Sequence, residues 1–231
     1  LAARYGLPFV STRLELGPNA SEAAAREARY DFLLDTAAQY QAPVVTAHHL
    51  DDLVETVALN LVRGTGWRGL AVLNRPGVER PLLGWRKADI RAYALAHRLE
   101  WVEDETNASD RYTRNRLRRC IQRLLTAEQA AQITALRHRQ LALRHTINDE
   151  VQHLLPQFAA ERHGLIMIDE ASAQELLGAM IMWAGAPRPT RPRLERAVLA
   201  IKTARPDSRH VVGDGVYLQF GPRQFTVEVV Q

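Results

Sequence analysis

The stretch from Pro43 to Val62 constrains the fold more than any other part of the chain. A short apolar run, Pro43 to Ala47, leads into the acid-rich sequence HHLDDLVET at residues 48–56. This pattern predicts a strand that turns directly into a helix. Apolar residues then recur at helical spacing, as Leu53, Val57, Leu61 and Val54, Ala58, Val62. We therefore expect a helix over residues 50–62 with one buried face.

Polar side chains gather near the first turn of this expected helix. Residues three apart are neighbours on a helix, so His49, Asp52 and Glu55 share a face, and Thr56 follows them. In open α/β sheets, ligands bind at the carboxyl ends of the strands, where this turn is expected. The acids also fit a simple helix-dipole role, worth about 0.3–1 kcal/mol each. With His48 they resemble a metal site, but the chain has no second cluster of ligands, and we expect no resident metal.

Charge and cysteine content narrow the class of protein. The net charge is +4, and Lys87 and Lys202 are the only lysines. From Arg111 to Arg144 there are nine arginines and one carboxylate, Glu128. A clustered basic stripe is typical of nucleic-acid binding, although a solvated helix face is the alternative. The single cysteine, Cys120, excludes an internal disulfide framework. With no signal peptide and no long apolar run, we expect a cytoplasmic protein away from membranes.

The first part of the chain alternates helices and strands. Residues 1–5 predict the end of a helix, Gly6 its stop, and residues 8–14 a strand, so we expect an N-terminal piece of the domain to be missing. Asn19 predicts the cap of a helix that runs to about residue 40. Together with the strand at 43–47 and the helix at 50–62, this order favours a parallel α/β sheet.

The segment after this helix is rich in turn residues. Gly64, Gly66 and Gly69 are a weak phosphate-binding signal without a Walker ending, and they fit helix termination equally well. Residues 80–83 predict a short extended segment. A helix over 86–98 follows, for which we expect the core-facing residues to be Ile90, Tyr93 and Leu95.

The composition changes near residue 126, where we place a domain border. Thr126 predicts the cap of a long helix to about residue 155. Residues 166–168 predict a strand, and residues 171–183 and 194–201 predict helices. Turns at 213–215 and 221–222 separate three closing strands. The pattern therefore predicts a smaller α+β domain over residues 126–231.

Six ordered segments carry a resemblance to a known family. The chain resembles the tRNA(Ile)-lysidine synthetases, a family within the PP-loop ATP pyrophosphatase superfamily. The matching segments are AREARY (25–30), HHLDDLVET (48–56), RGTGWRGL (63–70), RPLL (80–83), WVEDETN (101–107) and RYTRNRLRR (111–119). The resemblance covers about residues 20–120, and beyond 126 it concerns the layout alone. It implies an α/β parallel-sheet domain of the adenine nucleotide alpha hydrolase-like type over residues 1–125, lacking its first strands. A substrate- or tRNA-binding α+β domain over 126–231 follows.

The resemblance also implies a reaction and roles for named residues. Enzymes of this family use ATP and Mg²⁺ to adenylate the C2 oxygen of the wobble cytidine in an isoleucine tRNA with a CAU anticodon. The ε-amine of free lysine then displaces AMP. Carried over by motif, the catalytic residues are His49, Asp52, Glu55 and Thr56. The expected ATP and phosphate contacts are Arg26, Arg29, Arg63 and Gly64. The expected tRNA contacts are Arg111, Arg114, Asn115, Arg116 and Arg118.

One departure and several alternatives accompany this interpretation. The family's Ser-Gly-Gly-x-Asp-Ser loop is not in the sequence, so we expect the chain alone to bind ATP poorly and to be inactive. The alternatives are a PP-loop tRNA thiolase, which typically needs paired cysteines, and a catalytically silent RNA-binding module. Amidation of the asparagine- or GMP-synthetase kind is disfavoured by the arginine-rich run. Which of Asp52 and Glu55 binds lysine, and the oligomeric state, stay open.

Overall fold

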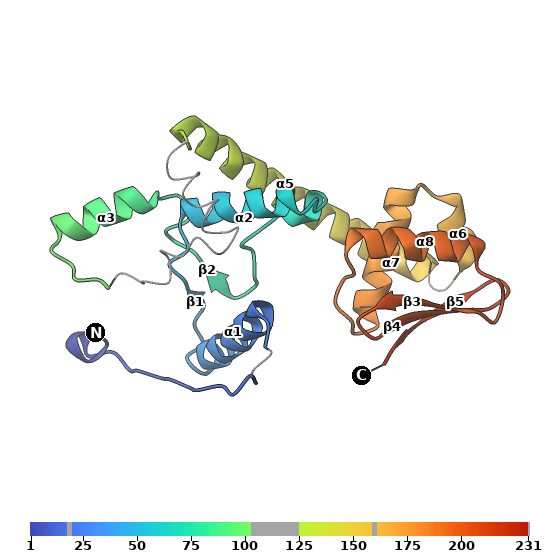
Figure 1. The fold of residues 1–231 in the computed structure, drawn as a ribbon, viewed down its shortest axis with the longest axis horizontal. Helices are drawn as coiled ribbons and strands as arrows, with labels where there is room; N and C mark the ends of the chain where they lie inside the picture. Colours follow the sequence, from blue (N-terminus) through green and yellow to red (C-terminus); the bar gives the residue numbers. More distant parts are fainter. Residues whose placement is uncertain (18–19, 103–124, 159–160, 231) are drawn as a thin grey trace. The chain divides into compact units, whose positions relative to one another are not determined.

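The computed structural model describes residues 1–17, 20–102, 125–158 and 161–230, and the chain divides into two compact units (Figure 1). The first unit comprises Leu1–Thr56 and Leu73–Ala130. The second comprises Val57–Val72 and Ala131–Gln231. Helix α2 therefore begins in the first unit and ends in the second. None of the helices in the described ranges combines the length and apolar character needed to cross a bilayer.

The first unit is a small α/β assembly. Its two strands pair in parallel, with Val44 opposite Val78 and Val45 opposite Glu79, and α1 lies beside β1 (Figure 1). This pairing confirms the predicted parallel α/β class. The elements are η1 (Ala3–Tyr5), α1 (Glu22–Gln39), β1 (Val44–Val45), α2 (Leu50–Val62), β2 (Val78–Glu79) and α3 (Lys87–Ala96).

The buried face of α2 packs into this unit at its N-terminal end. Leu50, Leu53 and Val54 are buried together with Tyr30 of α1 and Val44 of β1. The helix has the predicted bounds of 50–62. Its apolar stripe is shorter than expected, because Leu61 and Val62 are 56% and 77% exposed. Burial of apolar side chains therefore stabilises the N-terminal part of α2, where the polar motif lies.

Several local predictions for the first unit are wrong. Residues 8–14 form no strand, since no described segment pairs with their backbone. Asn19 lies outside the described residues, and Ser21 caps α1 by accepting a hydrogen bond from the Ala24 amide at 3.1 Å. Residues 80–83 form a turn closed by Leu83 N–H to Arg80 O at 3.1 Å, because Pro81 favours the second position of a turn.

Helix α3 also differs from its prediction. It covers Lys87–Ala96 and contains no buried residue. Tyr93 and Leu95, which we expected in the core, are 58% and 66% exposed. Tyr93 stacks on His97 with ring centroids 4.1 Å apart. The apolar periodicity of this short helix therefore does not mark a core-facing stripe.

The second unit packs helices against a small antiparallel sheet. Strands β3, β4 and β5 follow one another, with Leu218 paired to both His210 and Val227. The elements are η2 (Trp67–Leu70), α5 (Ala127–Phe158), α6 (Arg162–Met167), α7 (Glu170–Trp183), α8 (Arg191–Thr203), β3 (Arg209–Gly213), β4 (Val216–Phe220) and β5 (Phe225–Val229). The predicted α+β layout and its three closing strands are present.

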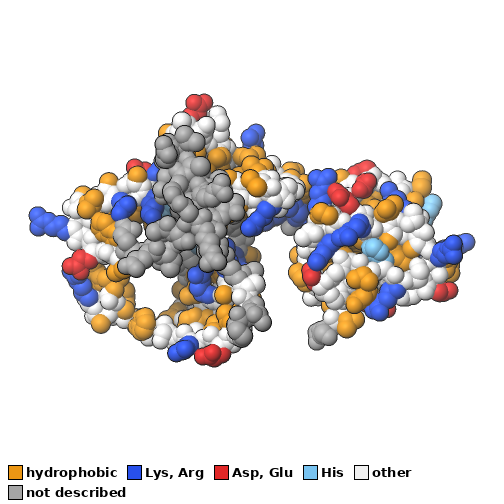
Figure 2. Space-filling view, viewed as in Figure 1, with side chains coloured by type: hydrophobic (Ala, Val, Ile, Leu, Met, Phe, Trp, Pro, Cys, Tyr) orange, Lys and Arg blue, Asp and Glu red, His pale blue; other side chains and the backbone are white. Residues whose placement is uncertain are grey.

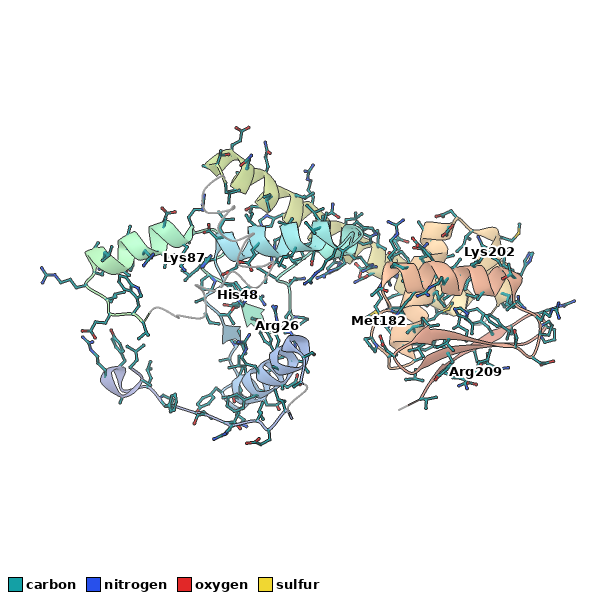
Figure 3. The ribbon with its side chains drawn as sticks, viewed as in Figure 1. Arg26, His48, Lys87, Met182, Lys202 and Arg209 are labelled. Carbon is teal, nitrogen blue, oxygen red and sulfur yellow. The ribbon has the colours of Figure 1, made fainter. Side chains whose placement is uncertain are left out.

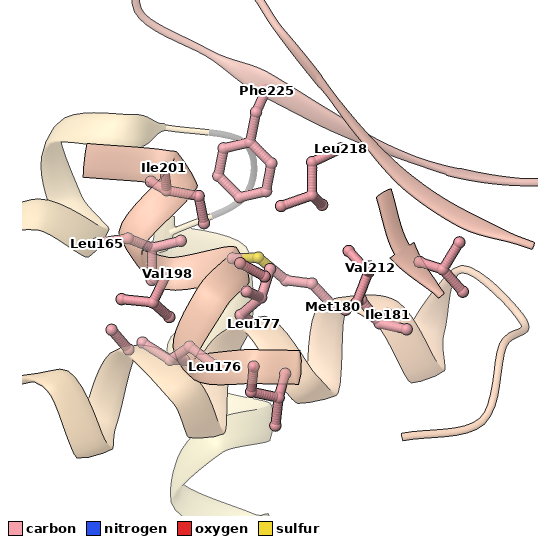
Figure 4. Packing of buried hydrophobic residues seen from close by; sticks show 14 of the residues in the cluster. Leu165, Leu176, Leu177, Met180, Ile181, Val198, Ile201, Val212, Leu218 and Phe225 are labelled. Carbon is pink, nitrogen blue, oxygen red and sulfur yellow. The ribbon is translucent and has the colours of Figure 1, made fainter. Parts of the chain in front are cut away.

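The core of this unit lies between α7, α8 and the sheet (Figure 4). Leu177, Ile181 and Leu218 are fully buried, as is Ala197. Burying a Leu or Ile side chain contributes about 1.5–3 kcal/mol, so this cluster supplies much of the unit's stability. The alternating burial along β4 gives the sheet one core face and one solvent face.

Two predictions for the C-terminal half of the chain have opposite outcomes. Thr126 caps α5 as expected, since its hydroxyl accepts from the Gln129 amide and the Gln129 side chain accepts from the Thr126 amide, both at 3.1 Å. Residues 166–168 are not a strand. Ile166 and Met167 end the short helix α6, whose Leu165 is buried in the core. Tertiary packing of Leu165 overrides the strand preference of the isoleucines.

Candidate active site

Helix α2 begins with a reciprocal cap made by two motif residues. The His49 amide donates to Asp52 Oδ2 at 3.0 Å, and the Asp52 amide donates to His49 Nδ1 at 3.4 Å. This arrangement is that of a capping box. The cap brings His49 and Asp52 together as their spacing predicts.

Asp51 ties the start of α2 to the start of α3. Its carboxylate is buried and accepts from Arg86 Nε at 3.2 Å and from the Lys87 amide at 2.7 Å. Asp51 thus caps α3 and pairs with Arg86. The sequence did not predict this role for Asp51, because Asp51 and Asp52 are adjacent acids in the first turn of the same helix.

A hollow of about 440 Å³ opens beside this helix start. It lies within the first unit, between α1 and the segment that follows β1. The lining residues are Arg29, Tyr30, Leu33, Thr46, Ala47, His48 and Asp52. Asp52 therefore reaches the hollow with a carboxylate that is about one-fifth exposed. Figure 3 marks His48 and Arg26 in this part of the unit.

His48 is held in the wall of the hollow. Its Nδ1 lies 2.8 Å from Thr46 Oγ1, within hydrogen-bond distance. Burial lowers the pKa of His48 below 6.5, and the positive charges of Arg80, Arg26 and Arg29 add to this effect against the opposing Asp52. His48 is therefore neutral at pH 7 and can accept a proton. The sequence pattern predicted no histidine as the proton acceptor, although the His48-His49 pair was a visible signal.

Three arginines lie around the aromatic ring of Tyr30. The guanidinium carbons of Arg26 and Arg29 each lie 5.8 Å from the ring centroid, and that of Arg75 lies 4.5 Å from it. The Tyr30 hydroxyl and Arg80 Nε are buried and have no hydrogen-bond partner within the described ranges. Guanidinium groups in such a setting suit phosphate groups. Arg26 and Arg29 both lie beside Tyr30, which lines the hollow, and their contact with an anion stays a prediction.

Glu55 and Thr56 do not line the hollow. Glu55 is 1% exposed and interacts with other parts of the protein. Thr56 donates its hydroxyl to the Asp52 carbonyl at 2.7 Å within the same helix. Asp52 is thus the carboxylate of the motif that faces the hollow.

Arg63 and Gly64 lie at the opposite end of α2 from Asp52. Gly64 has φ +67°, its amide donates to Leu61 O at 3.0 Å, and the Thr65 amide donates to Asn60 O at 3.1 Å. These bonds form a Schellman motif, in which glycine ends a helix. Arg63 is exposed, and neither residue lines the hollow. The geometry therefore favours helix termination for Gly64.

The other predicted sites fall outside this description. Arg111, Arg114, Asn115, Arg116 and Arg118 lie outside the described residues. Within the described ranges, no three His, Cys, Asp or Glu side chains are placed to hold a metal ion together. The visible basic surface consists of Lys and Arg side chains interspersed with acids on both units (Figure 2).

The hollow combines three kinds of group. Among the described residues that line it are one carboxylate (Asp52), one neutral imidazole (His48) and one arginine (Arg29). A carboxylate can hold an ammonium group or accept its proton, and an imidazole can do the latter. Arginines can stabilise phosphate charge. This combination suits a reaction between an amine and a phosphate-bearing molecule.

Comparison with known proteins identifies the first half of the chain. The ATP_bind_3 family model, described as a PP-loop domain, matches residues 1–125. This match spans more than half of the 231 residues. It includes all the elements that form the hollow.

Curated relatives extend the similarity further along the chain. The tRNA(Ile)-lysidine synthase of Aromatoleum aromaticum is 36% identical over 201 residues, covering 80% of this chain and 46% of the relative. That of Pseudomonas aeruginosa is 39% identical over 162 residues, covering 67% and 35%. That of Pectobacterium atrosepticum is 32% identical over 227 residues, covering 90% and 51%. The chain thus spans about half or less of the length of these relatives.

Proposed function

Because this chain belongs to the PP-loop domain family, we propose that it acts in the ATP-dependent attachment of lysine to tRNA. The reaction is the one named in its relatives, that of tRNA(Ile)-lysidine synthase. The observation that carries the proposal is the hollow in which Asp52 and His48 face Arg29. The hollow lies within the part of the chain that matches the family.

The reaction has two steps with a balanced transfer of groups. The C2 oxygen of the wobble cytidine attacks the α-phosphate of ATP, and pyrophosphate leaves. The ε-amine of lysine then attacks C2, the C2–oxygen bond breaks, and AMP leaves. The amine must lose protons to become a nucleophile and to end as a neutral substituent. A nearby base is therefore required.

Asp52 and His48 supply the groups for this proton transfer. The Asp52 carboxylate attracts the lysine ammonium, and its partial exposure leaves it reachable from the hollow. The lowered pKa of His48 keeps its imidazole unprotonated and ready to accept a proton. His49 and Thr56 position Asp52 through the helix start. Glu55 is assigned a supporting role, because it is buried.

The arginines contribute charge stabilisation. Arg26 and Arg29 face the phosphates of the nucleotide, where positive charge favours the leaving pyrophosphate. Arg63 and Gly64 remain proposed phosphate contacts from the motif alone. Mg²⁺ accompanies ATP, and the single carboxylate of the hollow fits an ion held mainly by phosphates and water. The motif residues Arg111, Arg114, Asn115, Arg116 and Arg118 are proposed to hold the tRNA backbone. We place the reaction in the cytoplasm.

Transfer of labelled lysine tests the proposal. The assay uses isoleucine tRNA with a CAU anticodon, with and without ATP. The protein is this chain extended at its N-terminus by the family's Ser-Gly-Gly-x-Asp-Ser segment, with the chain alone in parallel. ATP-dependent labelling of the tRNA by the extended protein supports the proposal. ATP consumption without lysine transfer favours a thiolase, and tRNA binding without either favours a silent RNA-binding module.

A further inference from the structure

A network of charged side chains surrounds the loop that follows α2, and all its members belong to the second unit. Arg68 of η2 donates from Nε to Glu175 Oε2 of α7 at 2.8 Å, and its Nη2 forms an ion pair with the same oxygen at 2.6 Å. The same Nη2 donates to Asn148 Oδ1 of α5 at 2.8 Å. Arg68 also stacks over the Trp67 ring, 4.6 Å from its centroid. The loop is therefore fastened to two helices through one arginine.

A second arginine uses the same carboxylate oxygen. Arg188 Nη2 donates to Glu175 Oε2 at 2.7 Å. Its guanidinium lies against Gly178 in the middle of α7, where any Cβ atom would overlap it. A glycine inside a helix costs about 1 kcal/mol relative to alanine.

A third arginine, Arg144 of α5, approaches the cluster without a carboxylate partner. Among the described residues, its one hydrogen bond runs from Nη1 to the Ala71 carbonyl at 3.1 Å. Burial lowers the pKa of both Arg144 and Arg188, and the charge of Arg68 adds to the effect in each case. Glu175 thus accepts from Arg68 and Arg188, while Arg144 has no carboxylate partner among the described residues. These three guanidinium groups and one carboxylate carry a net charge of +2 in a half-buried position.

Two other arginines of this unit each have a carboxylate partner of their own. Arg209 pairs one-to-one with Glu228 at 2.9 Å, and Arg193 pairs with Asp214. Arg162 is buried but donates to the carbonyls of Ile201 and Ala204, where the end of α8 presents negative partial charge. The Arg68–Glu175 ion pair alone would be enough to hold the loop against α7. The excess charge of the cluster calls for an anion.

We propose that Arg68, Arg144 and Arg188 form a phosphate-binding site, and that its ligand is a backbone phosphate of RNA. Planar guanidinium groups bind phosphate oxygens through paired N–H donors. The adjacent Trp67 ring adds an aromatic surface of the kind that RNA-binding surfaces combine with arginine. The identity of the RNA as tRNA rests on the proposed function. The phosphate site itself rests on the charge and geometry of the cluster.

The test measures tRNA affinity of this chain across a series of salt concentrations, without ATP or lysine. The variant is Arg144→Gln, which keeps a side-chain donor for the Ala71 carbonyl. Arg209→Gln is the matched control, because it removes one arginine charge of the same unit that Glu228 already balances. We expect Arg144→Gln to weaken binding about tenfold and to reduce the salt slope by about 0.9. The control keeps the wild-type slope. Wild-type affinity and slope in a folded Arg144→Gln protein would overturn the site.

Glu175→Gln distinguishes a binding site from a structural fastening. Removing this carboxylate raises the net charge of the cluster from +2 to +3. A phosphate site then binds tRNA as tightly as wild type or more tightly, even though the melting temperature falls. A fall in tRNA affinity that accompanies the fall in melting temperature would contradict the proposal.

Inorganic phosphate serves as the probe for the source of the anion. Competition by millimolar phosphate for tRNA binding in the wild type, lost in Arg144→Gln, supports an RNA phosphate in the cluster. A different outcome would refute the RNA ligand and assign the site to free phosphate. In that outcome, phosphate raises the melting temperature of the wild type but not of Arg144→Gln, while the salt slope of tRNA binding is the same in both proteins. These measurements involve no lysine transfer. They therefore test the phosphate site even if the proposed reaction does not occur.

Discussion

The His49 amide donates to Asp52 Oδ2 over 3.0 Å, so the carboxylate proposed to handle lysine also holds the first turn of α2. One oxygen of Asp52 is therefore engaged in the helix cap. Cap and chemistry thus depend on the same side chain.

Replacement of Asp52 separates these two contributions. We expect Asp52→Ala to abolish lysine transfer, to leave tRNA affinity within about twofold, and to lower the free energy of unfolding by about 1 kcal/mol. Ser21→Ala is the control, because Ser21 caps α1 of the same unit at 3.1 Å from the Ala24 amide. It should cost a similar amount of stability and retain lysine transfer. Substantial transfer by Asp52→Ala would contradict the role of this carboxylate.

The neighbouring acid has a structural role that stability measurements can reveal. Asp51→Ala removes the partner of Arg86 and of the Lys87 amide. We expect it to lower the free energy of unfolding in urea by about 2 kcal/mol, because it leaves two half-buried donors unpaired. Asp89→Asn, an exposed acid in the first turn of α3, should change it by less than about 0.5 kcal/mol. Equal effects of the two substitutions would argue against the connection between α2 and α3.

The stability of the first unit should depend on pH through His48. Burial lowers the pKa of this imidazole in the folded state, with Arg80, Arg26 and Arg29 contributing. Between the lowered value and about 6.5, the unfolded chain binds more protons than the folded one, so stability falls as the pH falls. His48→Gln should flatten the melting temperature over this range and match the wild-type pH dependence above pH 7. An equally steep loss of stability in His48→Gln would show that another group is responsible.

The arginine-rich motif predicts a measurable electrostatic effect. We expect Arg114→Ala and Arg118→Ala each to weaken tRNA binding and to reduce the salt slope by about 0.9. The loss should be similar for different tRNAs, since phosphate contacts carry no direct sequence information. Arg193→Ala, whose charge is paired with Asp214, is the control and should keep the slope. Unchanged slopes in both motif variants would remove this segment from the tRNA-binding surface.

Periodicity predicted the elements whose apolar faces are long and buried. Helix α2 has its predicted bounds, and Leu50, Leu53 and Val54 of its apolar face are buried. The helix over residues 171–183 was recognised because Leu176 and Leu177 are buried, as their spacing indicates. In both cases local pattern and tertiary packing agree.

The secondary structure of the short elements depends on contacts between residues that are distant in sequence. Ile166 favours a strand locally, yet the chain forms α6, whose Arg162 donates to the Ile201 carbonyl from a position 39 residues away. Likewise, Tyr93 and Leu95 were expected in the core, but both are exposed, since α3 contains no buried residue. No pattern within a short window contains this information.

The candidate site was predicted in part for a similar reason. Motif spacing placed Asp52 and His49 together, and the structure adds their reciprocal cap. His48 was missed because its lowered pKa arises from burial and from arginines of α1 and of the turn after β2. Asp51 was missed because its partners, Arg86 and Lys87, lie 35 and 36 residues away. These contacts exist only once the first unit is folded.

The most direct test of the central claim is the ratio of AMP released to lysine attached. The extended protein is incubated with ATP, labelled lysine and isoleucine tRNA bearing either a CAU anticodon or the same anticodon with its wobble cytidine replaced by uridine. The account predicts one AMP for each lysine bound to the cytidine-bearing tRNA, and neither product with the uridine-bearing tRNA. AMP release without attached lysine, or equal labelling of both tRNAs, would contradict it.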